Sequence, residues 1–92
     1  MTMVKPFTWN PQKNEWLKNN RGISFEQIVS TLATDLLSVR QNTSKRHPAQ
    51  LVFIIKIKEY AWVVPFKESE TEIQLKTAFP DRRLAKEFEL ER

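Results

Sequence analysis

The chain contains no cysteine, a single glycine (Gly22) and a single histidine (His47). Without cysteine there is no disulfide framework, no thiol nucleophile and no thiolate metal site. One glycine cannot build the glycine-rich loops that cradle phosphates in P-loop and dinucleotide-binding proteins, so those classes are excluded. The longest apolar runs, 51–55 and 61–66, are far too short to span a membrane, and the first six residues lack the apolar core of a signal peptide. We therefore expect a cytoplasmic protein that has no contact with a membrane.

The charge of the chain is basic and unevenly distributed. The 92 residues, enough for one domain over 1–92, carry 15 lysines and arginines against 11 acids, a net charge of +4. The segment 40–58 contains basic residues and no acid, whereas the acids gather over 59–72 and near the C-terminus. This asymmetry favours an anionic partner on one face, either a nucleic acid or an acidic protein. A solvated surface that merely happens to be basic explains the same charge, and both interpretations stay open.

Capping residues and apolar spacing predict two helices in the N-terminal third. A short strand over 7–9 leads to Asn10, which is followed by proline and is typical of a helix start, and Gly22 is typical of the residue after a C-cap. Ser24, with a glutamine three residues later, begins a capping box. Apolar residues then recur at helical spacing and predict a helix over 24–34.

The remainder of the chain alternates in the manner of strands and ends in a helix. Lys58-Glu59 is expected to be the tight turn of a hairpin, and Pro65 is expected at a strand end or an edge. Asp81 can cap a final helix. The predicted strands are 37–40, 51–57, 60–66 and 72–79. The order β-α-α-β-β-β-β-α indicates an α+β fold, an antiparallel meander sheet with two N-terminal helices and one C-terminal helix.

Strand alternation predicts two different sheet faces. Ile73, Leu75, Thr77 and Phe79 would share the apolar face with the odd-numbered residues of 51–57, and the helices would cover that face. The second face would be mixed and would carry Lys56, Gln74 and Lys76. We expect a ligand to bind on this second face.

The side chains that could carry chemistry are basic. One histidine without cysteine predicts no metal site and no cofactor, and no motif supports a Ser-His-Asp triad or paired carboxylates. RNA can be cleaved through its own 2′-OH when a proton exchanger and cations surround the phosphate, and His47 titrates in the right range. Exposed loop and strand residues without function are the plain alternative. The candidates are Lys13, Arg46, His47, Lys56, Lys76, Arg82 and Arg83.

Three segments resemble the BrnT family of small bacterial toxins. Residues 7–14, FTWNPQKN, resemble its opening F-x-W-(D/N)-x-x-K-(N/A), and residues 21–26, RGISFE, resemble its (H/R)-G-(V/I)-S-F-E. Residues 75–83, LKTAFPDRR, are similar to the basic strand-to-helix ending of that family. The family's I-S-A-R core is KTAF here, over 76–79, and its Asn-Gly turn is Lys-Glu, over 58–59.

This resemblance implies a fold like those of the RelE and ParE toxins. It implies the toxin of a type II toxin–antitoxin pair, a metal-independent endoribonuclease that acts on mRNA, inhibits translation and is neutralised by a cognate antitoxin. We accordingly expect catalytic roles for Lys76, His47 and Arg82 and RNA-binding roles for Lys13, Arg46, Lys56 and Arg83. Two alternatives stay open: a non-catalytic basic module that binds RNA, the ribosome or a protein partner, and a plain interaction domain.

Overall fold

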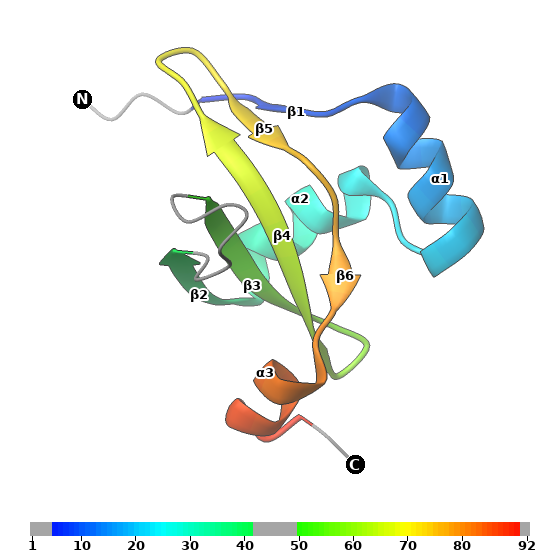
Figure 1. Ribbon diagram of the computed structural model, residues 1–92, viewed down its shortest axis with the longest axis vertical. Coiled ribbons are helices and arrows are strands. Elements are labelled where there is room, and N and C mark those ends of the chain that lie inside the picture. Colours follow the sequence, from blue (N-terminus) through cyan, green and yellow to red (C-terminus); the bar gives the residue numbers. More distant parts are fainter. Residues whose placement is uncertain (1–4, 42–49, 91–92) are drawn as a thin grey trace.

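The computed structural model describes residues 5–41 and 50–90, and within them the chain is α+β. Three helices accompany a mixed sheet of six strands in these residues (Figure 1). The elements are β1 (Phe7–Thr8), α1 (Pro11–Arg21), α2 (Phe25–Thr34), β2 (Leu36–Gln41), β3 (Leu51–Ile57), β4 (Tyr60–Glu68), β5 (Ile73–Leu75), β6 (Phe79–Pro80) and α3 (Arg82–Glu87).

The sheet is mixed, so the prediction of an antiparallel meander is only partly right. The strands follow the order β1-β5-β4-β3-β2, and β6 also pairs with β4. The β2–β3, β3–β4 and β4–β5 pairs are antiparallel, but β1 runs parallel to β5, with Phe7 opposite Ile73. A parallel neighbour needs a long connection, and here residues 9–72 lie between the two strands. This long-range pairing leaves no mark on the local sequence.

The local signals predicted from the sequence are confirmed at the helix ends and at the hairpin. The Oδ1 atom of Asn10 accepts hydrogen bonds from the second and third residues of α1, and Gly22 follows that helix at φ 68°. The Ser24 hydroxyl accepts from the Gln27 N–H at 3.1 Å. Lys58 and Glu59 form the β3–β4 turn with φ 53° and 63°. Two positive φ values belong to the turn that matches strand twist, and here it forms without glycine or asparagine.

The predicted strand 72–79 is divided by a β-bulge. From Leu75 to Phe79 the chain advances four residues, whereas their partners on β4, Phe66 and Val63, are three residues apart. One extra residue therefore lies between β5 and β6, and it exchanges the faces of the side chains that follow. Phe79 packs on the second face, so the prediction that it shares a face with Leu75 is wrong.

Pro65 explains where the ladder between β4 and the following strand breaks. It lies inside β4, not at a strand end or an edge as expected. The Pro65 carbonyl accepts the Lys76 N–H at 2.9 Å. In an antiparallel strand the nitrogen and the carbonyl of one residue point to the same neighbour, so the Pro65 nitrogen also faces the gap between β5 and β6. Proline has no N–H to return that bond, which weakens the pairing where the bulge forms.

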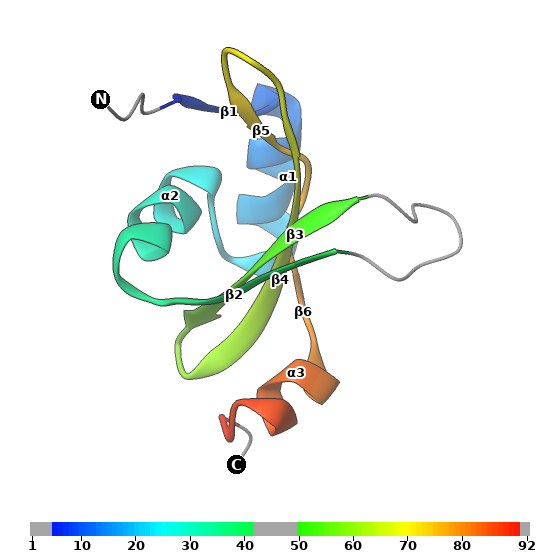
Figure 2. The same ribbon diagram turned by 90° about the vertical axis from the view of Figure 1, so that its left-hand side faces the viewer.

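Both faces of the sheet are covered, but to different extents. α1 and α2 pack on the first face around Leu17, Phe25 and Ile28. On the second face, Ala85 of α3 is fully buried against a cluster that includes Ala61 and Val63. Figure 2 shows the sheet nearly edge on, with α2 on one side and α3 at the lower end. The second face was expected to be open. Within residues 5–41 and 50–90, α3 covers the end nearest the β3–β4 turn, and no helix covers the end that carries Lys67, Gln74 and Lys76.

Candidate functional site

Two lysines meet around one glutamine on the uncovered half of the second face. Lys67 on β4 lies directly opposite Gln74 on β5, and paired residues of antiparallel strands project on the same face. Lys76 lies two residues further on, and its ammonium donates to Gln74 Oε1 at 2.9 Å. We call Lys67, Gln74 and Lys76 the β4–β5 lysine cluster.

Two acids that flank the cluster in the sequence, Glu68 and Glu72, are already engaged. The Glu72 carboxylate accepts a hydrogen bond from the Thr8 hydroxyl at 2.6 Å. Glu68 pairs with the Lys5 ammonium at 2.7 Å. The exposed ammonium groups of Lys67 and Lys76 form no ion pair with a carboxylate among residues 5–41 and 50–90. The cluster therefore presents two positive charges to an anionic ligand.

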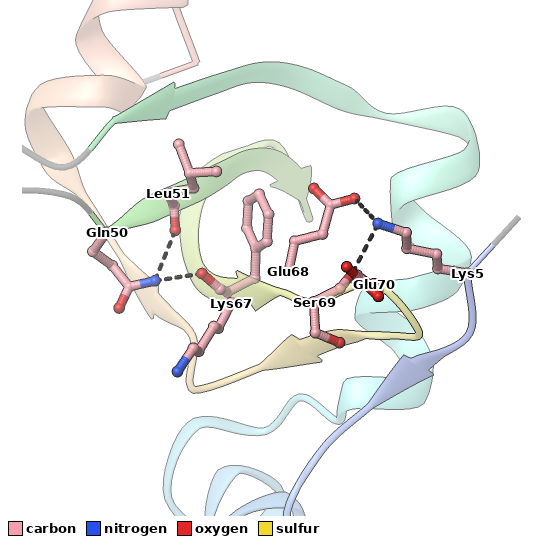
Figure 3. A pocket seen from close by; sticks show the side chains of 8 residues that line it. Lys5, Gln50, Leu51, Lys67, Glu68, Ser69 and Glu70 are labelled. Atoms are coloured by element: carbon pink, nitrogen blue, oxygen red, sulfur yellow. Dashed lines mark hydrogen bonds and ion pairs between the residues drawn. The ribbon is translucent and has the colours of Figure 1, made fainter. Parts of the chain in front are cut away.

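A hollow of about 770 Å³ opens beside Lys67 at the end of β4. Most of its polar lining is satisfied within the chain, because Lys5 binds Glu68 and the Ser69 carbonyl while Gln50 donates to the Phe66 carbonyl. Figure 3 shows Lys67 extending away from the Lys5–Glu68 ion pair. Of the four charged residues that line this hollow, Lys67 and Glu70 form no ion pair within the described residues, so the lining offers one free charge of each sign.

A second basic group lies on α1 around an exposed tryptophan. The Lys13 ammonium lies 4.2 Å from the centroid of the Trp16 ring, and the Arg21 guanidinium lies 4.7 Å from it. Leu17 of the same helix is fully buried, which turns Trp16 outward with 40% of its surface exposed. We call Lys13, Trp16 and Arg21 the α1 cluster.

Arg21 connects the α1 cluster to the bulged strand. Its guanidinium donates to the carbonyl of Ala78, two residues after Lys76. Figures 1 and 2 both show α1 beside the link between β5 and β6. The two clusters thus lie on opposite faces of the sheet. Residues 76–78 connect them, because Lys76 projects on the second face whereas Ala78 packs in the first-face cluster with Leu17 of α1.

The structure does not gather all seven predicted residues at one place. Lys76 belongs to the β4–β5 lysine cluster and Lys13 to the α1 cluster, whereas Lys56 lies near the β3–β4 turn, 3.9 Å from Asp35 and 4.0 Å from Glu59. Arg46 and His47 lie outside the described residues. The remaining two, Arg82 and Arg83, are on α3.

The α3 arginines lie apart from both clusters. Arg83 lines a groove of about 550 Å³ between α3 and the sheet, together with the Arg40–Glu87 ion pair. This groove has an apolar floor formed partly by Val52 and Val63. It lies over the second face and extends to Val52, whose partner on β4 is Pro65, the residue whose carbonyl accepts the Lys76 N–H.

Lys67 and Arg21 belong to the clusters, although neither is among the seven candidates predicted from the sequence. The predicted strand ended at Phe66; extending its alternation by one residue places Lys67 on the second face. Arg21 is the last residue of α1, and no local pattern shows that its partner would be Ala78. That contact depends on the tertiary structure.

The carboxyl groups with perturbed pKa values belong to neither cluster. A hydrogen bond from Asn14 lowers the pKa of Glu26, and a hydrogen bond from Arg40 lowers the pKa of Glu87. Over the described ranges, no three His, Cys, Asp or Glu side chains gather in a way that could hold a metal ion.

No family model, no curated protein and no solved structure matches this chain. The function must therefore be argued from the two clusters and from their surroundings. In the part of the chain that the structure describes, no helix is long and apolar enough to cross a membrane.

Proposed function

We propose that this protein is a cytoplasmic RNA-binding module whose β4–β5 lysine cluster contacts phosphates. The observation that carries this proposal is the pairing of Lys67 and Lys76 around Gln74, on the half of the sheet face that α3 leaves uncovered. Ammonium groups without a carboxylate partner bind phosphate oxygens and release counterions, which supplies most of the affinity for a nucleic acid. The Gln74 amide can also donate to a ribose or phosphate oxygen.

The arrangement favours binding over cleavage. Cleavage through the 2′-OH needs a proton acceptor, a proton donor and cations around a single phosphate. Lys76 follows β5, whereas Arg82 begins α3 on the other side of β6. The carboxylates of Glu72 and Glu68 are held by Thr8 and Lys5. The described residues thus supply the cations that binding needs, whereas His47, the proton exchanger expected from the sequence, lies outside them. We therefore rest the proposal on binding.

A salt titration of RNA binding tests the proposal. The measurement is fluorescence anisotropy of a labelled oligouridylate of about 12 nucleotides. Lys67→Gln and Lys76→Gln should each weaken binding and lower the slope of log affinity against log salt by about 0.7, because each removes one phosphate contact to a single strand. Lys58→Gln removes the same charge from the exposed β3–β4 turn and is the matched control.

Two results would contradict this assignment. Equal slopes for the wild type, the two cluster variants and the control would show that the cluster does not contact phosphates. A 2′,3′-cyclic phosphate product that forms in the presence of chelator and is lost in Lys76→Ala, with folding intact, would replace binding by endoribonuclease activity.

We further propose that the module is the toxin of a type II pair and that its fold is a variant of the RelE/ParE architecture. The three resembling segments support this, as does the order of two helices, an antiparallel hairpin and a C-terminal helix. An acidic antitoxin segment would then cover the β4–β5 lysine cluster and exclude RNA. Induced expression should slow bacterial growth, and Lys67→Glu with Lys76→Glu should abolish that effect and weaken antitoxin binding. Growth that wild-type expression leaves unchanged would contradict the toxin role.

A further inference from the structure

Trp16 is placed on the surface by a helix that is firmly anchored. α1 is capped at Asn10, and Leu17 of the same helix is fully buried. The Asn14 side chain accepts from the Phe25 N–H at 2.8 Å and donates to Glu26 at 2.9 Å. The orientation of the indole is therefore set by a rigid element, which makes it suitable for recognition.

The other two tryptophans have a structural explanation, and Trp16 has none. Trp9 stacks on Phe25 with ring centroids 5.6 Å apart, and Trp62 packs against the buried cluster of the first face. Trp16 instead contacts two cations, and neither Lys13 nor Arg21 pairs with a carboxylate in the described segments. Both cations lie over the ring of Trp16, so a base that stacks on this ring takes the place of one of them, and the displaced cation can meet an adjoining phosphate.

We propose that Trp16 stacks on an unpaired base of the bound RNA, so the ligand of this protein is single-stranded. The inference rests on the proposed RNA-binding function and adds its substrate class. Bases inside a duplex are stacked on each other, so an aromatic side chain on the protein surface cannot stack on them. Bases of a single strand can be splayed out and can stack on aromatic side chains. The bond from Arg21 to the Ala78 carbonyl places this ring on the edge that follows Lys76. A strand whose phosphates meet Lys67 and Lys76 on the second face would reach Trp16 by passing around residues 76–78, where Arg21 contacts Ala78.

Removing the bases from the RNA separates stacking from charge. The probes are a labelled oligouridylate of about 12 nucleotides, an abasic ribose-phosphate chain of the same length and an RNA duplex of the same length. Trp16→Ala should weaken oligouridylate binding about five-fold or more and leave abasic binding and the salt slope unchanged. Trp16→Phe should recover a large part of the loss, because phenylalanine keeps an aromatic face. Lys18→Gln, on the same exposed helix, is the control, and circular dichroism verifies the fold of each variant.

The outcomes separate this inference from the proposed function. If Lys67→Gln and Lys76→Gln weaken binding while Trp16→Ala does not, or if Trp16→Ala weakens oligouridylate and abasic binding equally, the stacking site is wrong and the phosphate site stands. If the lysine variants bind every probe as tightly as the wild type, the proposed phosphate site is wrong. Duplex binding as tight as oligouridylate binding would overturn the assignment to single-stranded RNA.

Discussion

Replacing Asn14 by alanine should destabilise the fold by breaking the joint between α1 and α2. Asn14 is a buried polar residue, 6% exposed, and it touches the first two residues of α2. Its Oδ1 accepts the Phe25 N–H at 2.8 Å, and its Nδ2 donates to Glu26 Oε1 at 2.9 Å. The Phe25 N–H is one of the donors that a helix start leaves without an intrahelical partner, so Asn14 supplies its acceptor. The sequence analysis had assigned Asn14 only to a family motif.

The expected loss comes mainly from one backbone group. Phe25 is fully buried, so its N–H would have no solvent to replace the lost acceptor. An unsatisfied buried donor costs about 1–3 kcal/mol, and we expect Asn14→Ala to lower the free energy of unfolding by about 2 kcal/mol. Asn14→Asp keeps an acceptor for the Phe25 N–H, but the new carboxylate then lies against the carboxylate of Glu26. Its loss should be smaller and should shrink on acidification, because protonation of one carboxyl restores a donor.

Urea unfolding at neutral pH, followed by far-UV circular dichroism, measures these losses by linear extrapolation. Glu26→Gln is the control, since it removes the charge at the exposed end of the contact and keeps the Phe25 bond. A loss in Asn14→Ala below about 0.5 kcal/mol, the range of ordinary surface substitutions, would refute the reasoning. So would a loss no larger than that of Glu26→Gln.

Two further predictions concern stability. Gly22→Ala should cost about 1 kcal/mol, because Gly22 has φ 68° and an added Cβ meets nothing within 4 Å, so only backbone strain opposes the change. Chemical unfolding measures this cost, and Gly22→Asn should recover part of it; equal stability of wild type and Gly22→Ala would contradict the strain. The Arg40 hydrogen bond lowers the pKa of Glu87 in the folded state below its usual 4.5. The stability that this pair contributes is therefore complete above pH 4.5 and is lost as the pH falls through the folded-state pKa. The thermal midpoint of the wild type should therefore fall more on acidification than that of Glu87→Gln, and parallel falls would show that the pair contributes nothing.

The parts of the fold that were predicted correctly are those specified by neighbours in the chain. Asn10, Gly22 and Ser24 act on backbone groups within a few residues, so they define the two N-terminal helices wherever those helices pack. The alternation over 51–57 likewise predicted which residues of β3 are buried on each face. At the hairpin end this alternation no longer holds across the pair, because Tyr60 packs with the second cluster whereas its partner Ile57 belongs to the first.

The candidate site was predicted less completely, because its geometry depends on distant partners. Lys76 and Gln74 were expected together on the second face, and the structure confirms that contact. Lys67 joins them only through the register of β4 with β5, and Arg21 meets Ala78 across the fold. Lys56 alternates onto the same face, yet the length of β3 carries it to the opposite end, beside Asp35 and Glu59.

The sequence by itself determined the helices, the hairpin, the basic charge and the α+β class, because caps, alternation and composition act locally or in sum. Only the tertiary structure decided which lysines meet and which surface stays open. Pro65 interrupts a ladder that the following strand would otherwise continue, and the resulting bulge turns Phe79 toward α3. α3 then covers half of a sheet face, and β1 adds to β5 from the far end of the chain. These contacts join residues far apart in sequence, so no local pattern could have specified them.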